Sequence, residues 1–473
     1  MAYKRGDRYQ VNMFPPTYDE LISQTDPARI YDEFVECLDT RELELKIDAN
    51  KVGHPEYDPK VMLKLILYGC SYGIRSSRKL EQACHHNITF IWLTRGFKPD
   101  YRTIARFRKR NSKILKNVFK LCARLCLRLG VIEGNTLFVD GTKMRANAAI
   151  KNTRGKATYT QALAQLDHRV NDLLKQWERT DTAESDQGSF VALRKDLHDA
   201  QQRQGKIKAM LGEMEEECRE SANSTDPDCV KVKGRQGIHA GYNGQIVADD
   251  KHGLILSCDV VSESNDSSQF ARQINIANRL SGKPCKTAVA DAGYADASTL
   301  AEIYQQDIEV IVPVVVRDPK KEGPFSKEYF RYDATNNCYI CPEGQTLSYQ
   351  GRNPQKRQHL YRIKNPKICH ICKHFGSCTQ GKRGRTIKRL YHEDINEQIK
   401  THCATHAAQQ TFRRRKHRAE KPFGYMKRTL GADHFLLRGL NLVNAEFAML
   451  ATCYNIRRIM TIFNGKNPFP AAI

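Results

Sequence analysis

Thr136-Leu137-Phe138-Val139-Asp140-Gly141 is a short apolar run that ends in an aspartate and a glycine. Ala288-Val289-Ala290-Asp291-Ala292-Gly293 repeats this arrangement later in the chain. Short apolar runs bounded by turn residues are typical of buried strands. We therefore expect Asp140 and Asp291 at the ends of two strands of one sheet. The alternative is that each is a turn residue near its glycine.

The surrounding sequence predicts a mixed α/β sheet. Strands that lie close together in sequence are followed by strands that alternate with helices, which favours helices packed on a sheet. The expected strands are His239–Val247, Leu254–Val261, Lys286–Asp291 and Ile308–Val316, and a helix is expected over Asp266–Leu280. Asn265-Asp266 is interpreted as the cap of that helix. Tyr242-Asn243-x-Gln245 either positions phosphates or supplies polar residues at a strand edge.

The first 133 residues predict a helical unit. Tyr57-Asp58-Pro59 indicates a helix start, and Ser76 is placed to cap a second helix. A longer helix is expected over Thr103–Leu129, within a stretch (101–130) that holds ten Lys and Arg residues and no acid. A basic helix face suits a phosphate backbone, and the alternative is a solvated face.

Residues 151–222 predict an antiparallel helical hairpin. Apolar residues recur at steps of three and four from Leu163 to Trp177 and again from Phe190 to Met214. This spacing forms a heptad seam, and the polar stretch Glu178–Ser189 is its natural turn. Such a hairpin would either dimerise the protein or project from its body.

The composition and net charge of the chain indicate an intracellular protein with a polyanionic partner. The chain has 473 residues, with 76 Lys and Arg against 53 Asp and Glu, which gives a net charge of +23. That surplus favours DNA or RNA as the partner. No apolar run is long enough to cross a membrane, and the first residues lack the apolar core of a secretory signal. We expect a cytoplasmic, nucleoid-associated location.

Glu420 is the only carboxylate between Thr411 and Arg428, a stretch dense with positive charge. Two strand-end aspartates and a helical glutamate are what metal-assisted phosphodiester chemistry needs, with two Mg²⁺ or Mn²⁺ ions held by carboxylate oxygens. The alternative for Glu420 is an ion pair with Arg413, Lys416 or Lys427, and Asp296 competes with Asp291 for its role.

Five of the sixteen cysteines predict a zinc ribbon. Cys338 and Cys341 form one Cys-x2-Cys pair, and Cys369 and Cys372 form a second, with Cys378 as a spare or alternative ligand. Four thiolates would close a structural zinc site in a small basic knob, since residues 351–390 hold twelve Lys and Arg and no acid. The alternative is a set of free thiols.

Taken together, the motifs resemble the DDE transposases of bacterial insertion sequences, which have an RNase-H-like catalytic core and a helical N-terminal domain. The matching stretches are 57–69, 76–81, 99–108, 139–143, 226–228, 241–245, 290–294 and 420–424, the last together with Lys427. The resemblance implies that Asp140, Asp291 and Glu420 are the catalytic triad and bind divalent metal. It also implies cleavage at the element ends, followed by attack of the freed 3′-hydroxyl on target DNA.

The glutamate helix departs from the family pattern. Many relatives carry Tyr-x2-Arg-x3-Glu-x6-Lys, and this chain keeps Glu420 and Lys427 at that spacing. Lys416 stands at the arginine position and Arg413 at the tyrosine position, so Arg414 or Arg415 would have to supply the guanidinium. Pro422 predicts a kink or a fresh helix start just after the glutamate.

We therefore expect a transposase that acts as a homodimer on DNA. The alternatives are a nuclease with the same core that never joins DNA, and a non-catalytic DNA-binding regulator. The expected DNA contacts are Arg102, Arg106, Arg108, Lys109, Arg110, Arg413, Arg414, Arg415, Lys416 and Lys427. The expected units are residues 1–133 (helical, DNA-binding), 134–150 (first core strand), 151–222 (helical hairpin insertion), 223–320 (core sheet), 321–392 (basic cysteine-rich insertion) and 393–473 (core helices with Glu420).

Overall fold

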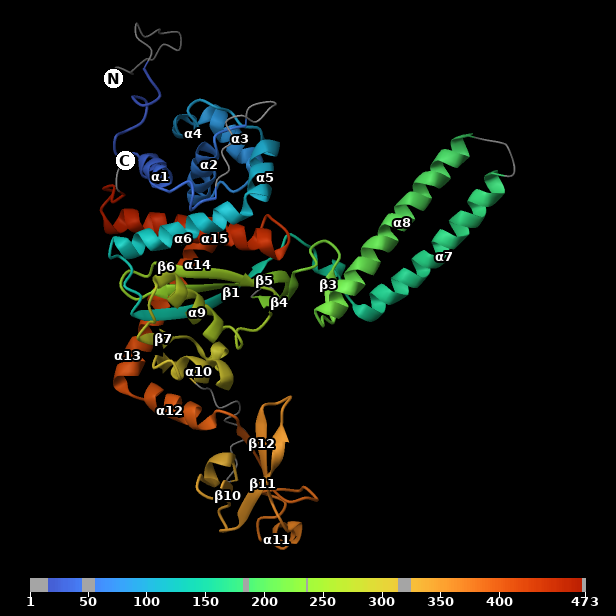
Figure 1. Cartoon of the computed structure of the whole chain (residues 1–473), viewed down its shortest axis with the longest axis vertical. Coiled ribbons are helices and arrows are strands. Elements are labelled where there is room, and N and C mark those ends of the chain that lie inside the picture. Colours follow the sequence, from blue (N-terminus) through green and yellow to red (C-terminus); the bar gives the residue numbers. More distant parts are fainter. Residues whose placement is uncertain (1–15, 45–55, 182–186, 235–236, 314–324, 470–473) are drawn as a thin grey trace, which may run out of the picture.

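The computed structural model describes residues 16–44, 56–181, 187–234, 237–313 and 325–469. Figure 1 shows a helical unit at one end, a central sheet covered by helices, a small β unit at the other end, and two long helices that project sideways. No helix of these described residues is long and apolar enough to span a membrane.

Six helices build the N-terminal unit: α1 (Pro27–Glu36), α2 (Pro59–Ser71), α3 (Ser77–His86), α4 (Ile88–Leu93), α5 (Tyr101–Arg110) and α6 (Ser112–Arg128). Asp58 caps α2 as expected, because its carboxylate accepts from the Lys60 N–H at 2.8 Å. Ser76 occupies the N-cap position of α3 but makes no side-chain capping bond.

The single long helix expected over Thr103–Leu129 is wrong. The chain breaks at Asn111, which separates α5 from α6. The Asn111 amide donates to the Phe107 carbonyl at 2.9 Å, and such a local bond competes with the helical ladder.

The central sheet is mixed, as the strand spacing predicts. Its order is β4-β5-β1-β7-β8, with β6 paired to β5. The strands are β1 (Thr136–Arg145), β4 (Val230–Gly234), β5 (Gly237–Asp249), β6 (Ile255–Val261), β7 (Thr287–Val289) and β8 (Glu309–Ile311). β1 runs antiparallel to β5 and parallel to β7, and β8 continues the parallel part.

Asp140 does not end its strand. β1 continues to Arg145 because it remains paired with β5 along its whole length. The pairing with β7 stops at Phe138, so Asp140 lies just beyond the reach of β7. Asp291 follows the end of β7 by two residues and opens the short turn η2 (Ala292–Tyr294).

Helices α9 (Phe270–Ser281), α10 (Ala297–Tyr304) and α15 (Leu440–Ile462) pack on or beside the sheet. α15 is apolar on nearly all sides and contacts α6, α2 and β6. Asn455 of α15 fixes it to β6 by bonds of 2.8 Å to both the N–H and the carbonyl of Ile255. The predicted start of α9 at Asp266 is wrong by four residues.

A buried ion pair joins the N-terminal helices to the region around α15. Arg75 Nη2 lies 2.6 Å from Glu446 Oε1, and both side chains are almost fully enclosed. Arg75 also donates to the carbonyls of Gly431 and His434 at 2.6 and 2.7 Å. Arg108 of α5 donates to the Arg75 carbonyl at 2.6 Å and completes this connection.

The two projecting helices are α7 (Lys156–Asp181) and α8 (Gln187–Glu216). Val170, Leu173 and Ala200 are buried between them, with Leu193 and Leu197 alongside. These residues belong to the two apolar series of the sequence. The centre of the predicted turn, 182–186, lies outside the described residues. β2 (Thr153–Gly155) pairs with β3 (Ser221–Asn223) at the base.

The small β unit is an antiparallel sheet of order β13-β12-β11-β10-β9. Its elements are β9 (Arg331–Asp333), β10 (Cys338–Ile340), β11 (Thr346–Asn353), β12 (Gln358–Ile363), α11 (Pro366–His370) and β13 (Thr386–Leu390). Phe330, Tyr339, Leu347, Tyr361 and Ile387 form a core separate from that of the central sheet.

The chain returns to the central sheet through α12 (Glu393–Cys403). A continuous helix follows, made of α13 (His406–Arg415), the π-helical turn η5 (Lys416–Glu420) and α14 (Lys421–Arg428). Ala408 and Ala419 of this helix are buried against Phe138, Val289 and Ile311 of the sheet. The glutamate is thereby held over the strands that carry the two aspartates.

Candidate active site

The three sequence-predicted carboxylates meet at one place. Asp140 points from β1, Asp291 follows the neighbouring parallel strand β7, and Glu420 is the last residue of η5. Their side chains share a single partner, the guanidinium of Arg415. Arg415 Nη1 lies 3.2 Å from Asp140 Oδ1 and 3.7 Å from Asp291 Oδ2, while Nη2 donates to Glu420 Oε1 at 3.0 Å.

The three carboxylates differ in their exposure. The side chain of Asp140 is only 10% exposed, whereas those of Asp291 and Glu420 are 40% and 47% exposed. Burial raises the pKa of Asp140 to about 7, the charge of Arg415 opposes this, and the charges of Asp291 and Glu420 add to it. A cation at this site would therefore stabilise the charged form of the buried Asp140.

The donor set suits a divalent cation of the Mg²⁺ type, which prefers carboxylate oxygens and needs few of them. Across the described part of the chain, no group of three or more His, Cys, Asp or Glu side chains is arranged to hold a metal ion. The contacts of Arg415 give the reason at this site, because its positive charge lies among the three carboxylates.

A π-helical turn brings Arg415 and Glu420 to the same side of their helix. Residues five apart on an α-helix lie about 140° apart around the axis. A π turn bonds each residue to the fifth along and is wider than an α turn, which brings residues five apart closer to the same side of the helix. η5 is such a turn, and it immediately precedes Pro422. The α-helical pattern is thus interrupted just before Pro422, and α14 starts at Lys421 with Pro422 in its first turn, in line with the fresh start that the proline predicted.

The ion pair of Glu420 is with Arg415, whereas the sequence offered Arg413, Lys416 and Lys427 as its partners. Arg413 and Lys416 are exposed, and Arg414 pairs with Asp250 at the end of β5. Arg414 is thus a local anchor of the helix.

Lys427 lies close to the site on the next turns of the same helix. Its Nζ donates to Thr142 Oγ1 at 2.6 Å and to the Lys143 carbonyl at 3.2 Å. This places a positive charge beside β1, two residues beyond Asp140.

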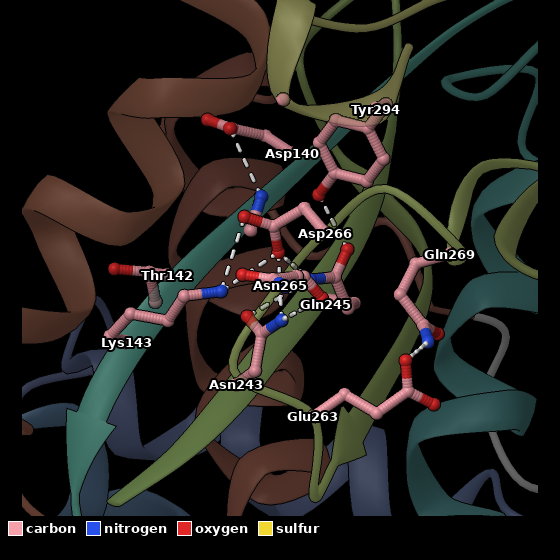
Figure 2. Close-up of polar contacts among 12 residues, drawn as sticks. Asp140, Thr142, Lys143, Asn243, Gln245, Glu263, Asn265, Asp266, Gln269 and Tyr294 are labelled. Carbon is pink, nitrogen blue, oxygen red and sulfur yellow. Dashed lines mark hydrogen bonds and ion pairs between the residues drawn. The ribbon is translucent and has the colours of Figure 1, made fainter. Parts of the chain in front are cut away.

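A polar network lies beside Asp140 that the sequence did not predict (Figure 2). Asp266 Oδ1 accepts from Asn243 and Gln245 at 2.7 Å each and from Lys143 at 3.0 Å. The Tyr294 hydroxyl donates to Gln245 Oε1 at 2.5 Å. Asp266 is therefore not a helix cap, because its carboxylate faces the strands. The strand-edge interpretation of Asn243 and Gln245 is also wrong, since both are buried in an inner strand.

Asp296, the competing aspartate, caps α10. Its Oδ1 accepts from the N–H groups of Ser298 and Thr299 at 3.1 and 3.2 Å. It makes none of the contacts with Arg415 that Asp291 makes. Asp291 Oδ1 also accepts from the Gly293 N–H at 2.8 Å, so its turn role and its place in the site coexist.

The basic N-terminal helix is only partly available to DNA. Arg102, Arg106, Lys109 and Arg110 are exposed on α5. Arg108 is 6% exposed and binds the Arg75 carbonyl, so its prediction as a DNA contact is wrong. Arg108 lies on the packed side of α5, where its long side chain binds the backbone at Arg75.

The cysteines that lie together in the structure are not the two Cys-x2-Cys pairs predicted from the sequence. Cys341, Cys369, Cys372 and Cys378 line one cavity of the β unit, together with apolar side chains such as Phe325 and Phe375. Burial raises the pKa of the Cys378 thiol, Arg385 lowers it, and the other three thiols raise it further. Cys338 is buried in β10 and does not line this cavity.

The comparison with protein-family models finds two matches. Residues 16–110 match a family model described as Transposase domain (DUF772), and residues 340–460 match one described as Transposase DDE domain. The second match contains Glu420 and Arg415, whereas Asp140 and Asp291 precede it. A search of curated proteins finds no significant match to the chain.

Proposed function

Because the chain belongs to the DDE-type transposases of insertion sequences, we propose that it cuts the DNA strands at the ends of its element and joins them to target DNA. The catalytic residues in this proposal are Asp140, Asp291 and Glu420. The observation that carries it is the convergence of these three carboxylates on one cationic centre, although they lie far apart in sequence.

Divalent metal ions bound by these carboxylates would activate the attacking oxygen and stabilise the leaving oxygen of the phosphodiester. The chain itself supplies their geometry. β1 fixes Asp140 rigidly within the sheet, and the packing of Ala408 and Ala419 fixes the helix that carries Glu420. Rigid elements of this kind hold reacting groups in place better than loops do.

The surrounding positive charge would hold the DNA. Arg102, Arg106, Lys109 and Arg110 of α5, together with Arg413 and Lys416 near the site, are exposed cations. Such contacts bind phosphates without reading sequence, and they weaken as salt rises. Because two element ends must be brought together, we propose that the active form is a homodimer on DNA.

We also propose that the β unit binds a structural zinc ion through Cys341, Cys369, Cys372 and Cys378. The support is that four thiols line one cavity and that the Gln345 N–H donates to Cys341 Sγ at 3.3 Å. The described thiols are not arranged as a coordination group, so zinc would have to draw them together. Cysteine thiolates are preferred zinc ligands in closed structural sites. Cys338, which the sequence spacing favoured, is not part of this set.

A strand-transfer assay tests the catalytic proposal. The purified protein would be incubated with Mg²⁺ or Mn²⁺ and DNA from the flanks of its own gene, either intact or pre-cut. We expect cut and joined products from the wild type and none from Asp140→Asn, Asp291→Asn or Glu420→Gln. Asp296→Asn is the matched control and should keep activity.

The outcomes separate the three candidate functions. Joined product supports a transposase. Cutting without joining of a pre-cut end would identify a nuclease. Binding without any metal-dependent change in the DNA, with the carboxylate variants indistinguishable from the wild type, would identify a regulator.

A further inference from the structure

The positive charge at the centre of the site comes from the chain itself. Arg415 is 15% exposed and contacts all three carboxylates through its two terminal nitrogens. A planar guanidinium can satisfy several carboxylates at once because its donors form a fixed fork. Three acidic side chains this close would otherwise repel one another.

The helix geometry makes this contact available. In a regular α-helix Arg415 would face away from Glu420, and Lys416 would share its face. The extra residue accommodated by η5 brings Arg415, in place of Lys416, to the side of the helix that carries Glu420. The sequence therefore follows the pattern Phe412-x2-Arg415-x4-Glu420, in which the arginine lies one residue earlier than the family spacing.

Phe412 supports the arginine from the previous turn. Its ring centroid lies 5.8 Å from the Arg415 guanidinium carbon, within range of a cation–π contact. Phe412 itself packs against the small apolar cluster that contains Phe138 and Val289. The guanidinium therefore contacts an aromatic ring that is itself packed against the sheet.

We propose that Arg415 is a positioning residue that holds the three carboxylates together before metal binds, and that incoming divalent cations must displace its guanidinium. This inference rests on the proposed function, in which the same carboxylates bind the metal. Arg415 contacts one oxygen of each carboxylate: Asp140 Oδ1, Asp291 Oδ2 and Glu420 Oε1. Its charge would repel a divalent cation bound to the same side chains, so Arg415 and the metal compete, and their affinities for the site are linked.

Mn²⁺ binding to the full-length protein without DNA tests this competition. Electron paramagnetic resonance of free Mn²⁺ would give the dissociation constant for the wild type, Arg415→Gln, Arg415→Lys and Arg414→Gln. Arg414 is the matched control, because it pairs with Asp250 and not with the triad. We expect Arg415→Gln to bind Mn²⁺ about tenfold more tightly, the effect of losing one competing charge-assisted contact.

The lysine variant keeps the test decisive if the glutamine variant does not fold. Lysine retains the charge but is a point donor that cannot bridge three carboxylates. Its Mn²⁺ affinity should therefore lie between those of the wild type and Arg415→Gln, with Arg414→Gln unchanged. Affinity equal to or weaker than that of the wild type in the folded Arg415 variants would overturn the proposal.

A second readout follows the unfolding temperature. At one Mn²⁺ concentration above both dissociation constants, the stabilisation grows with the logarithm of that concentration over the dissociation constant, so the rise in Tm should be larger for Arg415→Gln than for the wild type. An equal rise would count against displacement. Asp140→Asn separates the two proposals: if it leaves Mn²⁺ binding intact, the metal site itself is wrong, whatever the arginine variants do.

Discussion

At the scale of single residues, the buried charge of Asp140 carries an electrostatic cost, which protonation removes and a nearby cation reduces. Its pKa is raised to about 7, mainly by burial. A carboxyl with a raised folded-state pKa binds more protons folded than unfolded, so it loses stability as pH rises from about 4 to about 7.

Asp140→Asn should therefore stabilise the metal-free protein. Removing the charge should raise Tm relative to the wild type, by a difference that grows from pH 4 to pH 7 and is constant above. The full effect corresponds to roughly 4 kcal/mol at about 1.4 kcal/mol per pKa unit. Thermal unfolding in EDTA across this pH range measures it. A difference independent of pH would show that the Asp140 carboxyl is not perturbed.

Gly141 is a second residue on which the site depends. A Cβ at this position would lie 2.5 Å from Gln245 Nε2 and 2.8 Å from both Asp266 Oδ1 and the Tyr294 hydroxyl oxygen. These atoms are locked in the polar network and cannot all move aside.

Gly141→Ala should cost about 1–3 kcal/mol of stability and reduce strand transfer, because the network beside Asp140 must shift. Gly212→Ala on α8 is the control, since its added methyl group meets no atom within 4 Å. Denaturation midpoints and the joining assay would be compared for the two variants. Equal behaviour would mean that the network is not tightly packed.

At the scale of elements, the π turn decides which arginine faces the glutamate. The sequence predicted a helix with Pro422 as an interruption, and it left Arg414 and Arg415 as equal alternatives. Side-chain spacing is read with α-helical periodicity, so a single π turn shifts every residue before it by one position. This is why the residue choice could not be made from the sequence.

Deleting His417 provides the test. The exposed His417 lies within η5, and its removal turns the five-residue step between Arg415 and Glu420 into an α-helical step of four. We expect the deletion variant to keep metal-dependent activity. Inserting one alanine after His417 should rotate Glu420 by about 100° and abolish joining. Loss of activity in both variants would contradict the register argument.

The β unit shows a similar limit of sequence spacing. Two Cys-x2-Cys pairs favoured Cys338, but its position in β10 buries it away from the cavity that the other four thiols line. Strand direction, which spacing alone does not give, decides this.

Metal analysis of the purified protein checks the revised ligand set. We expect about one zinc per chain in the wild type and in Cys338→Ser, and a loss of zinc in Cys372→Ser. A structural site also stabilises its unit, so Cys372→Ser should expose this region to proteolysis. Retention of zinc by Cys372→Ser together with its loss from Cys338→Ser would restore the original pairing.

At the scale of the whole molecule, the sequence predicted the parts but not how they are joined. The mixed sheet and the meeting of Asp140, Asp291 and Glu420 were expected, because strand patterns and motifs are local signals. Arg108 and Asp266 were misassigned because their roles depend on partners far along the chain, Arg75 and Asn243. Burial and long-range pairing of this kind leave no periodic trace in a single sequence.

The ion pair between Arg75 and Glu446 should be essential for stability. Arg75→Ala leaves the buried Glu446 carboxylate without this cation, with the backbone N–H groups of Leu436 and Leu437 still donating to it. Removing one partner of a buried pair typically costs about 3–5 kcal/mol. Arg124→Ala is the control, because its pair with Glu42 is exposed and 3.8 Å long. We expect a large fall in Tm for the first variant and little change for the second. Similar Tm values would mean that the buried pair does not hold the units together.

This same connection has a consequence for the proposed cleavage of DNA. Arg75 and Arg108 fasten the helices that carry the exposed cations to the body that carries the carboxylates. Because these contacts join the two parts, the exposed cations and the carboxylates would stay at a fixed separation. A duplex bound by the exposed cations would then place the same phosphodiester at the three carboxylates each time, a constant number of base pairs from the bound end.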